Sequence, residues 1–77
     1  MTSREILARN LKMLRSLRGL SQEALADGAG MDRTYVSALE RQRYSASIDR
    51  LDHLAAQLGV KTYMLLVDEP PTDAFKP

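Results

Sequence analysis

The sequence predicts a compact, all-α domain of five helices. Two observations carry this prediction. Apolar residues recur at spacings of three and four along five segments, and no stretch alternates apolar and polar residues as a half-buried strand does. At 77 residues the chain has the length of one domain. We expect this domain to span residues 1–67, with a flexible, acidic and proline-rich tail over residues 68–77.

The first helix is expected from about Ser3 to Arg18. Thr2 and Glu5 have the spacing of a capping box, in which each side chain bonds the other residue's backbone N–H. Gly19 follows as a residue that adopts a left-handed conformation at little cost, so the helix should end there. The leucines at this helical spacing, which we assign to the core, are Leu7, Leu11 and Leu14.

Two short helices follow, separated by a glycine turn. Ser21 is a good N-cap for a helix to about Gly28, although a glycine inside that helix lowers its stability. Gly30 then permits a tight turn. Asp32 is the expected cap of a third helix, from about Arg33 to Gln42.

Ser47 is the expected cap of a fourth helix, Ile48 to Leu58, and a fifth should run from Thr62 to Leu66. The two prolines after Glu69 prevent its continuation. In addition to the leucines of the first helix, the predicted core contains Leu25, Val36, Leu39, Ile48, Leu51, Leu54 and Leu58.

Composition excludes several functions. The chain has no cysteine and one histidine, His53, so we expect neither a metal site nor a cofactor. No catalytic constellation is present, and Asp49 and Asp52 lack a partner nucleophile or phosphate loop, which argues against an enzyme. The longest apolar run, residues 64–67, is far too short to cross a bilayer, so we expect no membrane and a cytoplasmic location.

Charge favours nucleic acid only weakly, because the formal net charge is +1. The distribution of the charges along the chain is more informative. Without the last ten residues the chain has ten basic and seven acidic residues, and the basic ones are concentrated in the first predicted helix. A basic face could bind phosphates, although solvated surface charge is the commoner explanation for such an asymmetry.

The second and third helices have the residues of a helix-turn-helix, with small Ala26 where the two would cross and Gly30 in the turn. At 100° per residue, Tyr35, Val36 and Leu39 form an apolar arc on the third helix. The opposite arc carries hydrogen-bond donors and small side chains that suit the major groove: Arg33, Thr34, Ser37, Ala38 and Arg41.

The segment GLSQEALADGAGMDRTYVSALER resembles the helix-turn-helix family of the lambda and 434 repressors and Cro, also called the XRE type. The resemblance extends over about residues 4–66 and implies a lambda-repressor-like domain that binds double-stranded DNA. It further implies a partly buried ion pair between Arg15 and Glu40. The implied base contacts are Arg33, Thr34, Ser37 and Ala38; the expected phosphate contacts are Ser21, Gln22, Arg41, Gln42 and Arg43. Arg41 and Arg43 would also suit the negative end of the third helix.

The run DRTYVSALER is also similar to the recognition helix of restriction–modification controller proteins, which are short dimers. The same run occurs in phage-type repressors and antitoxins, so these alternatives stay open. The fifth segment has more apolar residues than a small monomer can cover, and we predict a homodimer interface there, which would bind a palindromic operator. Its residues are Tyr63, Met64, Leu66 and Val67, with Leu65 assigned to the core. The alternative function is an antitoxin or adaptor that chiefly binds a protein; RNA polymerase and a toxin are the conceivable protein partners.

Overall fold

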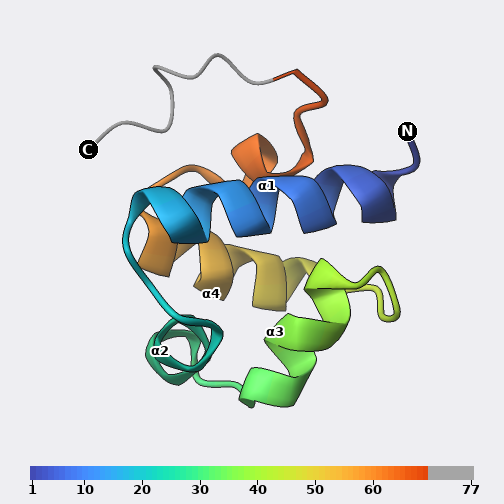
Figure 1. Ribbon diagram of the computed structural model, residues 1–77. Helices are drawn as coiled ribbons and strands as arrows, with labels where there is room; N and C mark the ends of the chain where they lie inside the picture. Colours follow the sequence, from blue (N-terminus) through green and yellow to red (C-terminus); the bar gives the residue numbers. More distant parts are fainter. Residues whose placement is uncertain (70–77) are drawn as a thin grey trace.

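The computed structural model describes residues 1–69 and consists of helices only (Figure 1). Four α-helices, α1 (Ser3–Leu17), α2 (Gln22–Ala29), α3 (Arg33–Glu40) and α4 (Ile48–Leu58), precede one short 3₁₀ helix, η1 (Thr62–Leu66). No strand occurs in this part of the chain. The prediction of an all-α domain is confirmed. Of the tail predicted from residue 68, residues 70–77 lie outside the described residues.

The fifth helix was expected to be like the others, and it is instead the 3₁₀ helix η1. Five residues are too few for a stable α-helix, and the tighter 3₁₀ turn closes a hydrogen bond over three residues rather than four. Lys61 occupies the N-cap position of η1 and offers no oxygen to cap it. The 3₁₀ geometry therefore follows from short length and a missing cap.

Most of the predicted helix starts are observed. Thr2 and Glu5 form both hydrogen bonds of the capping box. The hydroxyls of Ser21 and Ser47 each accept a backbone N–H in the first turn of α2 and α4. Asp32 has the extended backbone of an N-cap, but its side chain makes no capping hydrogen bond, so that part of the prediction is wrong.

The third helix is shorter than predicted, because α3 ends at Glu40 rather than at Gln42. Gln42 adopts a left-handed conformation with φ of 63°, which no α-helix contains. The N–H of Arg43 then donates to the carbonyl of Ala38 at 2.9 Å, so the chain closes over the end of the helix. A left-handed glutamine is uncommon, and no feature of its sequence neighbourhood predicts it.

The core lies between α1, α2, α3, α4 and η1. Its largest fully buried side chains are leucines and one valine: Leu11, Leu14, Leu25, Val36, Leu39, Leu54, Leu58 and Leu65. Ile48 was assigned to this core, and that assignment is wrong, because its side chain is 74% exposed. As the first residue of α4, Ile48 stands at the edge of the helix where no other element covers it.

A buried asparagine connects α1 to η1. Asn10 is fully buried, and its side-chain N–H groups donate to the carbonyls of Met64, Leu65 and Val67 at 3.3, 3.0 and 2.9 Å. The amide oxygen of Asn10 accepts hydrogen bonds from Arg9, which also donates to the carbonyl of Asp68. We call Arg9 and Asn10 the clasp. Figure 1 shows η1 held on the side of α1 that faces away from α3.

Candidate nucleic-acid interface

Helices α2 and α3 are joined by a three-residue turn, Gly30–Asp32, and pack directly on each other. Gly30 has φ of 72°, where a glycine avoids steric strain, and Met31 donates its N–H to the carbonyl of Ala26 at 2.9 Å. Ala26 and Val36 are fully buried between the two helices and the rest of the core. In Figure 1, α2 is seen nearly along its axis while α3 runs across the view, so the two helices cross steeply.

The first turn of α3 presents the predicted polar edge. Arg33 and Thr34 are exposed and Ser37 is half-buried. Ala38 departs from the prediction of an exposed arc, because it is only 5% exposed. Its small side chain nevertheless lines a surface hollow together with Thr34.

Basic side chains follow at the other end of α3. Arg41, Gln42 and Arg43 are all exposed, and Arg41 and Arg43 line the same hollow as Thr34. Arg41 donates to the carbonyl of Ser37 at 3.4 Å, a long hydrogen bond that a stronger acceptor would replace. Of the predicted base and phosphate contacts, Thr34, Ala38, Arg41 and Arg43 therefore line one hollow at α3 and the loop after it, whereas Ser21 and Gln22 lie at the start of α2.

Behind that face lies the ion pair between Arg15 and Glu40. The Glu40 side chain is 1% exposed and accepts two hydrogen bonds from Arg15, at 2.7 and 3.0 Å. This contact raises the pKa of the Arg15 guanidinium, so its charge is permanent in any physiological buffer. Gln22 also donates to Glu40, at 3.1 Å, which uses one of the two N–H groups of its side chain. The carboxylate thus connects α1, α2 and α3.

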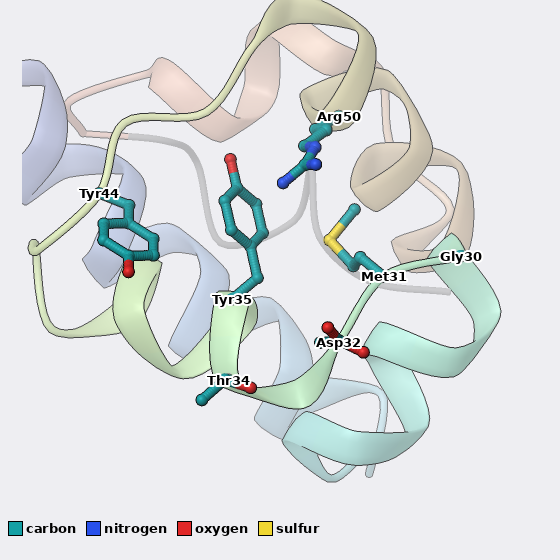
Figure 2. Close-up of a pocket in the computed structure, with 7 residues that line it drawn as sticks. All are labelled: Gly30, Met31, Asp32, Thr34, Tyr35, Tyr44 and Arg50. Atoms are coloured by element: carbon teal, nitrogen blue, oxygen red, sulfur yellow. The ribbon is translucent and has the colours of Figure 1, made fainter.

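A second group of residues, which the sequence pattern did not predict, lies beside the first turn of α3 (Figure 2). Tyr35, assigned to the apolar arc, is half-buried, and its hydroxyl donates to the carbonyl of Ser45 at 3.1 Å. Tyr44 lies on one side of its ring, with centroids 6.0 Å apart, and the guanidinium of Arg50 lies on the other, 4.3 Å from the centroid. The loop between α3 and α4 brings these residues together, and its path could not be predicted.

Three of the predicted dimer residues, Tyr63, Met64 and Leu66, lie on η1, and Val67 follows directly after it. Tyr63 is 62% and Leu66 43% exposed, whereas Met64 and Val67 are half-buried. Leu65 is fully buried, as predicted. The segment therefore exposes apolar surface although its central residue belongs to the core.

The described residues show no metal-binding cluster: no three His, Cys, Asp or Glu side chains of residues 1–69 could hold an ion together. Over the same residues, no helix is long and apolar enough to span a bilayer. The histidine, His53, is exposed on α4.

A small helical domain with a glycine turn between two short crossing helices, and an exposed arginine and threonine on the second, has the features of the helix-turn-helix class of DNA-binding domains. Comparison with known proteins agrees. The helix-turn-helix family pattern matches residues 11–65, and the chain belongs to this family, the XRE type of DNA-binding transcription regulator.

Three relatives are informative. The crystal structure of a hypothetical transcription factor from Neisseria superposes with a TM-score of 0.84 at 44% identity, covering 94% of this chain and 80% of that one. Control protein C.SmaI of Serratia marcescens is 38% identical over 86% of this chain and 79% of its own length. The restriction-modification controller protein C.AhdI of Aeromonas hydrophila superposes with a TM-score of 0.78 at 35% identity, covering 80% of this chain and 94% of that one.

Proposed function

We propose that this chain is a homodimeric regulator of the restriction–modification controller type, which binds a palindromic operator through α3. In this proposal α2 and α3 are the helix-turn-helix, and α3 enters the major groove. The observation that carries it is the polar edge of α3: Arg33 and Thr34 are exposed at its first turn while Val36 and Leu39 anchor the helix in the core. The similarity to C.SmaI and C.AhdI over most of their lengths supports the controller type.

Each residue of the interface has a distinct task in this mechanism. Arg33 pairs with a guanine edge through two parallel hydrogen bonds, and Thr34 and Ser37 contact neighbouring bases. The second side-chain N–H of Gln22, together with Ser21 at the start of α2, binds a phosphate, and the exposed side chains of Arg41, Gln42 and Arg43 bind further phosphates. Phosphate contacts supply affinity, whereas Arg33 supplies discrimination between sequences.

Pairing through η1 completes the proposal. Two copies related by a two-fold axis would place their α3 helices about 34 Å apart, which is one turn of DNA. Tyr63 and Leu66 offer the apolar surface for this contact. Tyr63→Glu should shift the protein to monomer in sedimentation equilibrium, whereas Leu17→Glu, at a residue that is 50% exposed on α1, should leave the dimer intact.

The decisive experiment is selection of bound sequences from a random pool of duplex DNA, read for half-site spacing and symmetry. Binding is then measured on the selected operator and on random DNA. Arg33→Ala should cost about 1–3 kcal/mol on the operator and little on random DNA, while Gln22→Ala should weaken both to a similar degree. Equal losses on both DNAs for Arg33→Ala would reject its assigned role. A monomeric chain that retains a stoichiometric protein and no specific DNA would favour the antitoxin or adaptor instead.

A further inference from the structure

The hollow in Figure 2 adjoins the proposed DNA interface on α3. It is lined by the turn before α3, by Thr34 and Tyr35 of α3, by Tyr44 of the following loop and by Arg50 from the first turn of α4. Thr34 is one of the proposed base contacts. A cation from a fourth helix therefore stands next to the surface that we assign to DNA.

The guanidinium of Arg50 is held in a fixed orientation. Its central carbon lies 4.3 Å from the centre of the Tyr35 ring, in the geometry of a cation–π contact. Tyr35 is itself immobilised, because its hydroxyl donates to Ser45 and its ring packs against the core. A guanidinium that stacks through its flat face keeps its N–H groups, which lie in the plane, available for a ligand.

Those N–H groups have no other partner among the described residues 1–69. The ion pairs within residues 1–69 are Arg9 with Asp68 and Arg15 with Glu40, and the Arg50 side chain donates no hydrogen bond among these residues. Asp32 lines the same hollow without coming within ion-pair distance of Arg50. An exposed guanidinium that is oriented but has no anionic partner is suited to an anion supplied from outside.

We propose that Arg50 is a ligand for a backbone phosphate of the bound DNA duplex, so that α4 contributes directly to the interface. This inference rests on the proposed function and adds a residue that the sequence prediction did not contain. A phosphate accepts two parallel hydrogen bonds from a planar guanidinium, which Arg50 can donate from its position over Tyr35. Because a phosphate carries no base identity, Arg50 adds affinity rather than sequence preference.

The test is the salt dependence of DNA binding, measured for the native chain and for Arg50→Met on the selected operator and on random duplex. Each lost phosphate contact lowers the slope of log K against log salt by about 0.9, so a dimer should lose about 1.8. Affinity at one moderate salt concentration should fall about tenfold per protomer, equally on both DNAs. Lys61→Met is the matched control: it removes one positive charge at the N-cap of η1, outside the hollow that contains Arg50, and should leave the slope unchanged.

Arg50→Lys keeps the charge without the planar stack and provides a second variant if Arg50→Met unfolds. It should keep most of the slope while still binding more weakly than the native chain, because an ammonium cannot donate the two parallel bonds. A native slope in a folded Arg50→Met protein would overturn the inference while leaving the proposed function intact. Failure of the native chain to bind any duplex would overturn both.

Discussion

Glu40→Gln is a sharp test of how the three helices behind the proposed DNA interface are held. The carboxylate of Glu40 is nearly inaccessible to water and accepts hydrogen bonds from Arg15 and from Gln22. Glutamine has almost the same shape but replaces one acceptor oxygen with an N–H donor. Whichever oxygen is replaced, that donor would face the Arg15 guanidinium, which can only donate.

The expected loss of stability follows from the burial of the Arg15–Glu40 ion pair. Removing one charge of a buried ion pair costs about 3–5 kcal/mol, because the remaining charge stays in a poorly solvated place. The Arg15 side chain is 20% exposed, which gives it partial access to water and favours the lower end, about 3 kcal/mol. A domain of this size has a total stability of about 4–12 kcal/mol, so the loss is a large share of it. The melting temperature should fall by about 12–24 °C.

The assay is urea unfolding of the native chain, Glu40→Gln, Arg15→Met and the double variant. If the two residues act as a pair, the double variant should be less destabilised than the sum of the single ones, with a coupling energy of about 2 kcal/mol. A cost below about 1 kcal/mol for Glu40→Gln, or strictly additive costs, would refute the claim that this pair organises the helices.

The remaining predictions concern local backbone and charge. Gly28→Ala should stabilise the domain by about 0.5–1 kcal/mol in thermal unfolding, because Gly28 is inside α2 and only the flexible end of Gln57 must move aside; an unfavourable change would show that Gln57 cannot move. Gly30→Ala, at a φ of 72°, should instead destabilise by about 1–2 kcal/mol, and a neutral result would contradict the strain argument. The hydrogen bonds from Thr2 lower the pKa of Glu5 below its usual 4.5. The contribution of Glu5 to the stability of the fold is therefore present above the usual pKa and is lost as the pH falls through the lowered pKa. Glu5→Gln should therefore flatten the loss of stability in acid, and an unchanged acid limb of the pH profile would argue against this cap.

The structure confirms some of the sequence predictions and contradicts others, for physical reasons. Helix starts at Thr2, Ser21 and Ser47 were predicted correctly, because a capping hydrogen bond joins residues only three apart and needs no tertiary information. The helical spacing of the leucines was sufficient to predict which of them form the core. It misassigned Ile48 because periodicity gives the face of a helix but not whether another element covers its first residue.

The site residues divide in the same way. The exposure of Arg33 and Thr34 follows from the angular position of each residue on one helix. The group formed by Tyr35, Tyr44 and Arg50 depends on the path of the loop after α3, which turns through the left-handed Gln42. The amino-acid sequence does not reveal a left-handed residue other than glycine. The position of this group could therefore be found only from the structure.

The clasp has a consequence for how such regulators diverge. Asn10 holds η1 through main-chain carbonyls, which every amino acid provides, so the hold does not depend on the side chains at positions 63 and 66. Those outward positions are free to change in shape or charge without loosening the segment that carries them. In the proposed dimer, substitutions at these two positions would therefore change which chains pair, while Asn10 still holds η1 in place.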